Sequence, residues 1–273
     1  MNRDRQIRIM GIVNLTDDSY FASSRCDGVD SALARVGHMV EQGADIIDIG
    51  ACSSRPGSRP LGMEMEWSRL EPVLRAIVLR FPSVTFSLDT CHAEVVRRAY
   101  NLIGNFIVND ISAGEADPEM LDVVGKAGLG YVAMHMRGTS ENMQHLTDYN
   151  NVVEDVKDYF ESFALKASYY GIKEWILDPG FGFAKDMAQN YALLNGLKSM
   201  KEVIMADGRS PEVLVGVSRK SMIYKYLDIT PEEALPATQV VHLAALQNGA
   251  DILRVHDVTE ALQTIRLYKE CFR

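Results

Sequence analysis

The stretch EQGADIIDIG, residues 41–50, carries the pattern that decides the fold. A glycine ends a helical segment, Ala-Asp follows, and a short isoleucine-rich run closes on Asp48 and Gly50. Runs that are apolar at nearly every position are typical of strands buried on both faces, and therefore of parallel sheets. QNGADILRVH, residues 247–256, repeats the same order and fits a second copy of one strand-and-helix unit. The similarity between the two stretches is too weak to define half-barrels.

Apolar runs of this kind recur along the whole chain, each ending in a polar residue and each followed by a longer segment with helical spacing. They cover residues 8–14, 44–50, 85–90, 106–111, 130–136, 174–180, 212–218 and 250–256. Eight strands alternating with about eight helices in 273 residues predict an α/β fold, a (β/α)8 TIM barrel. A doubly wound open sheet is the alternative, but eight evenly spaced units favour closure. No linker interrupts the pattern, so residues 1–273 are expected to form a single domain.

Several helix boundaries can be read from capping and turn residues. An amphipathic segment follows Asp30 and ends near Gly43, and a long periodic segment spans residues 150–171. Asp117 is expected to start a helix with proline at its first position, and Thr230 to start another that ends near Gly249.

Composition excludes several classes of protein. A net charge of −9 argues against a nucleic-acid or membrane-surface protein, and no apolar stretch approaches the roughly 18 residues of a membrane span. The N-terminus indicates the start of a strand rather than a signal peptide. Four scattered cysteines without a C-x-x-C pair indicate reduced thiols of a cytoplasmic protein rather than a zinc site.

Polar residues collect where the predicted strands end, which in such barrels is the rim that carries the chemistry. They are Asn14, Asp48, Asp89, Asn109, Asp110, His135, Asp178, Ser218 and His256. One polar residue at a strand end is usually a turn former or a helix cap, but the whole set on one rim indicates a site. Three long loops, residues 15–28, 51–66 and 137–149, leave the same rim, as lids do.

The rim residues divide by chemistry. Asp89, Asn109 and Asp178 carry acceptor-rich groups that can hydrogen-bond the edge of a heterocycle, and Lys220 can pair with the acids or bind a ring carbonyl or nitrogen. Asp178 as a simple turn cap and Lys220 as a surface lysine are the alternatives.

A basic group lies across the barrel. Arg254 and His256 alternate on the last strand and so face the same side; Arg55 follows the second strand, and Asn14 lies on the first. A buried arginine in a barrel interior is costly unless it meets an anion, and this region of such barrels commonly binds phosphate. We therefore expect a phosphate or pyrophosphate site, with an internal ion pair between Arg254 and a rim carboxylate as the alternative.

The alternation in ILDPGFGFAK, residues 176–185, suggests either a phosphate loop or an aromatic wall. Its place after the sixth strand, away from the basic group, favours the second. Gly180 and Gly182 are expected to let the chain turn tightly, so that Phe181 and Phe183 line the pocket for a flat ring.

Five ordered motifs, MGIVNLTDDSY, IIDIGACSSRPG, LDPGFGF, VGVSRKS and ILRVHD, closely resemble those of the dihydropteroate synthase family, from about Ile9 to Val258. The resemblance implies a (β/α)8 barrel, usually a homodimer in the cytoplasm. It also implies condensation of 6-hydroxymethyl-7,8-dihydropterin pyrophosphate with p-aminobenzoate, with Mg²⁺, to give dihydropteroate and pyrophosphate. The small-molecule substrates are then the ligands, and sulfonamides are inhibitors of the family.

The resemblance also implies roles for individual residues. Asp89, Asn109, Asp178 and Lys220 resemble the pterin set, and Asn14, Arg254 and His256 the pyrophosphate set, with Asn14 near the metal. Ser54, Arg55 and Pro56 resemble the loop that closes over p-aminobenzoate, and Phe181, Phe183, Lys220 and Ser221 match positions lining the two ring sites. The groups expected to act in the reaction itself are Asn14, Arg55, Asp89, Lys220, Arg254 and His256.

The chain departs from the family pattern in two loops. In the first, Asp17 replaces a proline and a glycine pair is absent. In the second, Cys52 stands where glutamate is common and Ser54 where threonine is common, which keeps a hydroxyl but removes one charge.

Three rival functions are left open. A pterin domain of a corrinoid methyltransferase has a similar acid–amide set but no reason to keep Ser218 to Ser221 together with Arg254 to His256. An aldolase-like barrel would use Lys220 as a Schiff base. A non-catalytic pterin-binding relative is favoured only by the altered first loop.

Overall fold

The computed structural model describes residues 6–15, 28–52 and 61–272. Within them, eight parallel strands close into a barrel in chain order, as the alternating runs predict. The strands are β1 (Arg8–Asn14), β2 (Ile46–Gly50), β3 (Thr85–Asp89), β4 (Ile107–Asp110), β5 (Gly130–Met134), β6 (Trp175–Asp178), β7 (Glu212–Val215) and β8 (Ile252–Val255). The barrel closes because β1 pairs with both β2 and β8.

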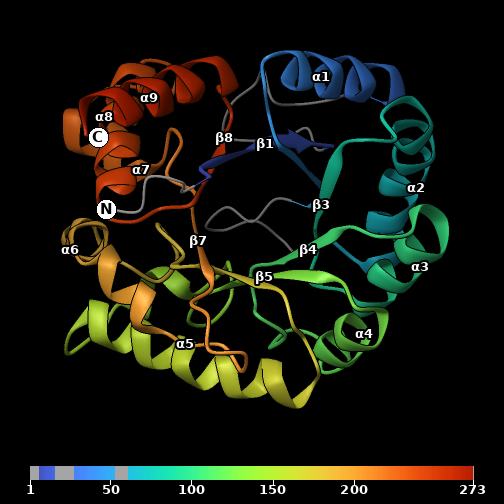
Figure 1. Ribbon diagram of the computed structural model, residues 1–273, viewed down its shortest axis with the longest axis horizontal. Coiled ribbons are helices and arrows are strands. Elements are labelled where there is room, and N and C mark those ends of the chain that lie inside the picture. Colours follow the sequence, from blue (N-terminus) through green and yellow to red (C-terminus); the bar gives the residue numbers. More distant parts are fainter. Residues whose placement is uncertain (1–5, 16–27, 53–60, 273) are drawn as a thin grey trace.

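Helices surround the barrel and cover its outer face (Figure 1). They are α1 (Val29–Glu41), α2 (Met63–Arg80), α3 (Ala93–Ile103), α4 (Met120–Ala127), α5 (Val152–Tyr169), α6 (Met187–Asn195), α7 (Ser221–Leu227), α8 (Leu235–Gln247) and α9 (Val258–Cys271), with short 3₁₀ turns η2 (Met143–His145) and η3 (Leu197–Glu202). Among the described residues, none of these helices combines the length and apolar character needed to cross a membrane.

Two predicted helix starts are wrong by a few residues, because a turn precedes each helix. Asp117 lies three residues before α4, which begins at Met120; its Oδ1 accepts the N–H of Glu119 at 3.0 Å in the intervening turn, and its Oδ2 accepts the N–H of Ala93 at 2.8 Å and so caps α3. Thr230 forms a closed turn with Glu233, whose carboxylate accepts the Thr230 N–H at 2.9 Å. Helix α8 then starts at Leu235, with Pro236 in its first turn.

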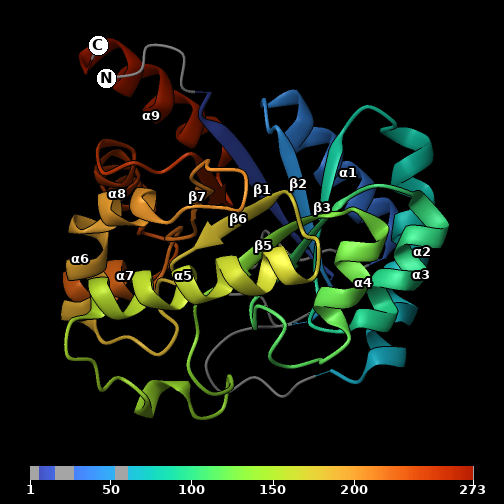
Figure 2. The ribbon, with the colours of Figure 1, turned by 60° about the horizontal axis from the view of Figure 1, so that its bottom comes forward.

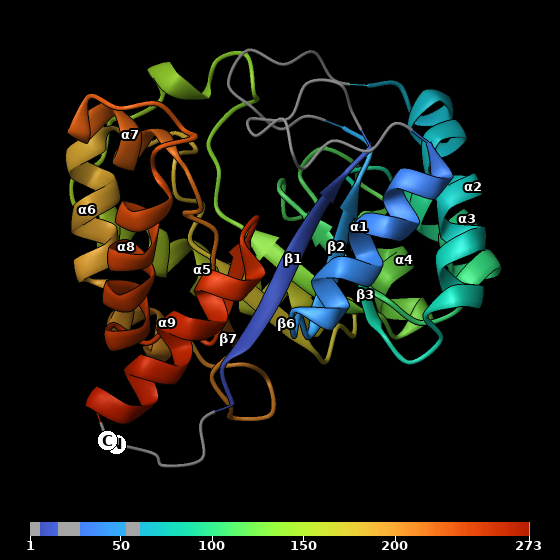
Figure 3. The same ribbon diagram turned by 90° about the horizontal axis from the view of Figure 1, so that it is seen from above.

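The carboxyl ends of the strands lie on one rim of the barrel. In Figure 3, β1 and β2 rise toward this rim, whereas α9 descends to the opposite end. The loop after β5, which contains η2, also lies on this rim. Residues that follow the strands are therefore brought together, although they are far apart in the chain.

Candidate functional site

The barrel interior holds two stacked layers of side chains. The lower layer is a buried apolar cluster made of Met10, Ile46, Val132, Ile176, Leu214 and Ile252. Because side chains alternate along a strand, the residue two positions further on faces the same interior. Those residues include Asp48 on β2, Asp178 on β6 and Arg254 on β8. The sequence thus builds a polar layer on an apolar plug, at the rim where the predicted site residues end.

Arg254 is held by two carboxylates. Its Nε donates to Asp48 Oδ2 at 2.7 Å, and its Nη2 donates to Asp89 Oδ2 at 2.9 Å. The ion pair that was the alternative interpretation of Arg254 is therefore present. Contact of the same guanidinium with a phosphate stays a prediction.

The acids around Arg254 outnumber it, which affects their protonation. Burial raises the pKa of Asp89 to about 7; the charge of Arg254 opposes this rise and that of Asp48 adds to it. Two carboxyl groups share one guanidinium, so the polar layer offers hydrogen-bond acceptors to a ligand that carries N–H groups.

Asp48 is the residue of this cluster whose role sequence reasoning missed. The sequence marks Asp48 as a polar residue at a strand end without giving it a role in the site. Its side chain is 1% exposed, and Oδ2 accepts from Asn109 Nδ2 at 3.1 Å as well as from Arg254. Within the described part of the chain its other oxygen, Oδ1, is buried without a hydrogen-bond partner. Alternation with Ile46 was the available signal, because it places Asp48 inside the barrel.

Asp178 lies at the start of the glycine-containing turn. Its Oδ1 accepts the N–H of Gly180 at 2.8 Å, so it does cap the turn, which was the alternative interpretation. The other oxygen, Oδ2, makes no such contact with the turn. One carboxylate can therefore cap the turn through Oδ1 and accept a hydrogen bond from a ligand through Oδ2. Burial raises the pKa of Asp178, and the positive charge of Lys220 opposes that rise.

The turn after β6 has the tight geometry that was expected, but it places its two phenylalanines differently. Gly180 and Gly182 have φ of 70° and 83°, and a Cβ on Gly180 would stand 2.0 Å from the carbonyl oxygen of His135. The ring of Phe181 is 0% exposed and packs in the main core. Phe183 is half-buried, beside Lys220. Phe181 contacts Lys220 through its backbone carbonyl oxygen and not through its ring.

Lys220 reaches the polar layer from the loop after β7. Its Nζ donates to the Phe181 carbonyl at 2.5 Å and lies 4.8 Å from the centre of the Phe183 ring. Burial lowers the pKa of Lys220 to about 8, and the charge of Asp178 limits the fall. Lys220 is thus not a free surface lysine, which was the alternative, and it retains a proton at pH 7.

The turn itself is wrapped around a second lysine that the sequence did not single out. Lys185 is 2% exposed, and its Nζ donates to the carbonyl oxygens of Gly180 at 3.1 Å and Phe183 at 3.0 Å. It also lies 2.9 Å from His135 Nδ1. His135 therefore contacts the turn after β6, through Lys185, and does not face the open rim.

His256 follows β8 at the edge of the polar layer. Its Nδ1 lies 3.0 Å from the Ser218 hydroxyl. Burial lowers the pKa of His256 to about 3, so the ring is neutral at pH 7. A neutral imidazole offers a hydrogen bond without adding charge.

The remaining predicted residues fall into two groups. Asn14 ends β1 and is half-buried, and Ser221 begins α7 and is half-buried. Ser54, Arg55 and Pro56, like Asp17, lie outside the described residues.

Cys52, which replaces a common glutamate, has a carboxylate beside it from another element. Burial raises the pKa of the Cys52 thiol, and the charges of Glu66 and Asp89 raise it further. Glu66 belongs to the first turn of α2, is 0% exposed and lies 2.6 Å from His92 Nδ1. A carboxyl group is therefore still present next to position 52.

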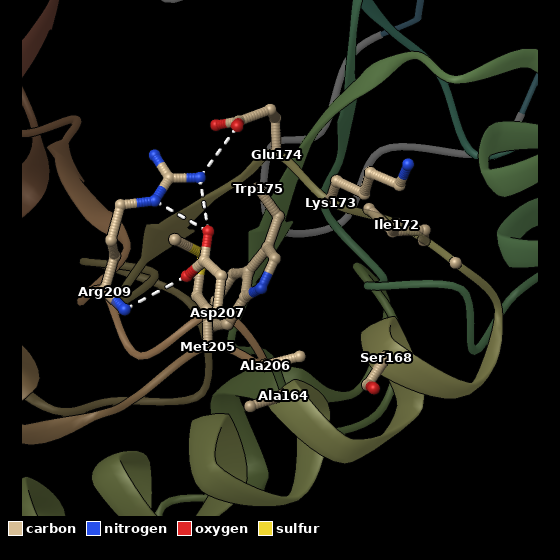
Figure 4. A pocket seen from close by; sticks show the side chains of 11 residues that line it. Ala164, Ser168, Ile172, Lys173, Glu174, Trp175, Met205, Ala206, Asp207 and Arg209 are labelled. Atoms are coloured by element: carbon tan, nitrogen blue, oxygen red, sulfur yellow. Dashed lines mark hydrogen bonds and ion pairs between the residues drawn. The ribbon is translucent and has the colours of Figure 1, made fainter.

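A separate hollow of about 430 Å³ is shown in Figure 4. It lies at the end of the barrel opposite the rim, because Trp175, the first residue of β6, lines it. Trp175 and Met205 line it, and Arg209 crosses its edge in ion pairs with Glu174 and Asp207. It contains none of the predicted site residues. In the described ranges, no group of three or more His, Cys, Asp or Glu side chains could hold a metal ion.

Comparisons with known proteins show the family and agree with the fold. The family model "Pterin binding enzyme" matches residues 10–256. A dihydropteroate synthase of Synechocystis is 37% identical over 268 residues, covering 97% of this chain and 90% of the relative. A Yersinia pestis dihydropteroate synthase solved with a sulfonamide drug matches with a TM-score of 0.91 at 33% identity, covering 100% of this chain and 96% of that one. A Burkholderia cenocepacia enzyme solved with 7,8-dihydropteroate gives 0.87 at 33% identity, covering 98% and 92%.

Proposed function

The chain belongs to the pterin-binding enzyme family as one of the dihydropteroate synthases, and we propose that its polar layer holds the pterin while Arg254 and His256 receive the pyrophosphate. It condenses 6-hydroxymethyl-7,8-dihydropterin pyrophosphate with p-aminobenzoate to give 7,8-dihydropteroate and pyrophosphate. The observation that supports the site assignment is the convergence of Asp48, Asp89, Asn109 and Arg254 in one buried network.

The pterin fits the polar layer by hydrogen-bond complementarity. Its ring N–H groups need acceptors, which Asp89 and Asp178 supply, and its ring carbonyl needs a donor, which Lys220 supplies. The Phe183 ring, which Lys220 contacts, adds an apolar aromatic surface beside the proposed pterin position. The apolar cluster beneath the layer excludes water from the ring edge, which strengthens these hydrogen bonds.

The reaction needs little base catalysis. The C–O bond between the pterin methylene and pyrophosphate breaks, the aniline nitrogen bonds to that carbon, and the nitrogen then loses a proton. An aromatic amine is already neutral at pH 7, so the barrier lies mainly in stabilising the departing charge and positioning the rings. Arg254 supplies positive charge for the leaving group, and neutral His256 supplies a hydrogen-bond donor.

The carboxylates favour a dissociative route. If pyrophosphate departs before the amine attacks, the positive charge spreads into the pterin, where Asp89 and Asp178 stabilise it. Positional isotope exchange in recovered substrate, measured without p-aminobenzoate, is the expected result. Clean inversion at the methylene, with neither exchange nor a trapped intermediate, contradicts the route.

Mg²⁺ is proposed at the leaving group, with Asn14 as its protein ligand. Asn14 supplies one amide oxygen at the rim, and magnesium commonly takes few protein ligands together with substrate phosphates and water. The ion would neutralise charge on the departing pyrophosphate. The Asn14 side chain would orient that group toward Arg254.

Asp178→Asn is expected to weaken pterin binding. The amide keeps the size of the side chain but replaces one acceptor with a donor, so the pterin N–H groups lose a partner. Pterin affinity is expected to fall by about 10- to 100-fold, because a hydrogen bond to a charged group contributes roughly 1.5–3 kcal/mol. Calorimetry with each ligand separately checks this, and an equal loss for p-aminobenzoate contradicts the assignment.

A pH effect follows from Lys220. The charged ammonium donates a stronger hydrogen bond than the neutral amine does, and the pKa of Lys220 is about 8, so pterin affinity is expected to fall as the pH rises through 8. Lys220→Arg keeps the charge at all accessible pH values and should flatten that step. An identical pH step in the arginine variant excludes Lys220 as the titrating group.

We also propose that the chain is a homodimer that pairs through α6, α7 and α8, which lie together on one side of the barrel (Figure 2). Large apolar side chains are exposed there, with Tyr226 at 66% and Val240 at 69%. Val240→Glu is expected to convert the dimer to a monomer by light scattering, because it places a charge in the apolar face. Leu79→Glu is the control, because Leu79 is 83% exposed but lies on α2, away from this surface. Dimers in both variants contradict the proposal that the chain pairs through α6, α7 and α8.

The thiols support a cytoplasmic location. Cys52, Cys91 and Cys271, the cysteines within the described ranges, are free. Free thiols are usual in reducing compartments. Fractionation of the native cell, with the chain traced by antibody, tests this.

A further inference from the structure

Arg219 lies between two residues of the site but faces away from it. Its φ is 53°, a left-handed conformation that residues other than glycine rarely adopt. Its side chain is 4% exposed. This turn lets Ser218 and Lys220 both approach the site, because the residue between them bends the chain outward.

The guanidinium of Arg219 joins three segments. Nε and Nη2 donate to the two carboxylate oxygens of Asp257, at 2.8 and 3.0 Å. Nη1 donates to the carbonyl oxygens of Pro231 and Glu232, at 2.9 and 2.7 Å. The loop after β7, the loop after β8 and the turn before α8 are thereby fastened to one planar group.

We call the contacts of Arg219 with Asp257, Pro231 and Glu232 the latch. Both Arg219 and Asp257 are sequence neighbours of proposed substrate contacts. Asp257 follows His256 directly, and Ser218, which precedes Arg219, lies 3.0 Å from His256 Nδ1. On the other side, Lys220 extends to the Phe181 carbonyl in the pterin pocket. Movement of the latch would therefore shift the pterin contact and the pyrophosphate contact together.

We infer that Arg219 is a positioning residue which, through its paired contact with Asp257, sets the separation of Lys220 and His256 and so the alignment of pterin and leaving group. The inference rests on the proposed roles of Lys220 and His256. The latch needs a fork-shaped donor, because both oxygens of Asp257 and two carbonyls are engaged at once. A lysine can meet only part of this set.

The left-handed backbone and the latch can be separated by substitution. Arg219→Asn keeps a residue that tolerates the left-handed conformation but removes the guanidinium. Arg219→Lys keeps a charge but not the fork. Arg209→Asn is the matched control, because it removes an arginine that pairs with Asp207 and Glu174 at the far end of the barrel.

Steady-state kinetics and pterin binding test the latch in the full-length protein. Arg219→Asn and Arg219→Lys are expected to lower kcat by 10-fold or more and to raise KM for the pterin substrate, while Arg209→Asn keeps wild-type values. The pH step of pterin binding near 8 is expected to move upward in Arg219→Asn, because Lys220 is no longer held in its buried place. A folded Arg219→Asn protein with unchanged kcat, KM and pH step overturns the inference.

Asp257→Asn covers the case in which the Arg219 variants do not fold. It keeps the shape of the side chain and weakens the same contact from the other partner, so it should reproduce the kinetic loss and the pH shift. Wild-type kinetics in folded Asp257→Asn overturns the inference as well.

Failure of the latch can be told from failure of the proposed site. Lys220→Ala and His256→Ala must each lose activity if the site is right, whatever Arg219 does. Active Lys220→Ala and His256→Ala proteins overturn the proposed site and the latch with it. Inactive ones beside a fully active Arg219→Asn overturn the latch alone.

Discussion

Replacing Arg254 by alanine is expected to lower kcat/KM by about 100- to 1,000-fold, the usual effect of removing one preorganised donor to a developing anion. The guanidinium supplies positive charge to the polar layer and is held by hydrogen bonds to Asp48 and Asp89. Most of the loss should appear in kcat, because the interaction strengthens as charge develops on pyrophosphate. Initial rates at saturating p-aminobenzoate measure it.

Two companion variants make the Arg254 result specific. Arg209→Ala removes an arginine far from the rim and should leave kcat/KM unchanged. Arg254→Lys keeps a charge but cannot reach both carboxylates as a fork does, so it should recover only part of the activity. An Arg254→Ala enzyme within about threefold of wild type contradicts the assignment of Arg254 to the leaving group.

Asp48→Ala is expected to reduce the free energy of unfolding by about 3–5 kcal/mol, the range for breaking a buried charge pair from one side. Asp48 is 1% exposed and accepts from both Arg254 and Asn109, so its removal leaves the Asn109 amide unsatisfied and Arg254 with one carboxylate. Urea unfolding followed by circular dichroism measures the change.

The control for Asp48→Ala is an exposed pair of the same chemistry. Asp122 lies 2.7 Å from Lys126 one turn along α4, and such surface pairs contribute about 0.3–0.5 kcal/mol. Asp122→Ala should therefore change the unfolding free energy little. A loss below about 1 kcal/mol in Asp48→Ala would show that the buried network is not stabilised through this carboxylate.

The barrel could be predicted because its signal is local and repeated. Each strand is a short apolar run, and the structure places all eight strands within the runs that the sequence marks, as the run at 44–50 and strand β2 at Ile46–Gly50 illustrate. Helix starts were less predictable. Asp117 and Thr230 both look like caps in sequence, and each accepts a nearby backbone N–H, but a turn separates each of them from the helix that follows.

The site could be predicted as a set of residues but not as a network. Strand alternation and family resemblance indicated Asp89, Arg254 and Lys220, whereas the partners of those side chains depend on contacts across the barrel. The sequence does not identify Asp48 and Arg219 as site residues, because both act through hydrogen bonds to other side chains. Asp48 accepts from Arg254 and Asn109, and Arg219 donates to Asp257. Phe181 was placed beside Phe183 by simple alternation, but left-handed glycines on both sides of it break the two-residue period and turn its ring into the core.

The most direct test of the account is a pyrophosphate-release assay on the purified chain with both substrates. The account predicts that pyrophosphate and 7,8-dihydropteroate appear in a 1:1 ratio, that release under turnover requires p-aminobenzoate, and that Arg254→Ala nearly abolishes both products. Tight pterin binding without release of pyrophosphate in the presence of both substrates contradicts it and identifies the chain as a pterin-binding relative without the synthase activity.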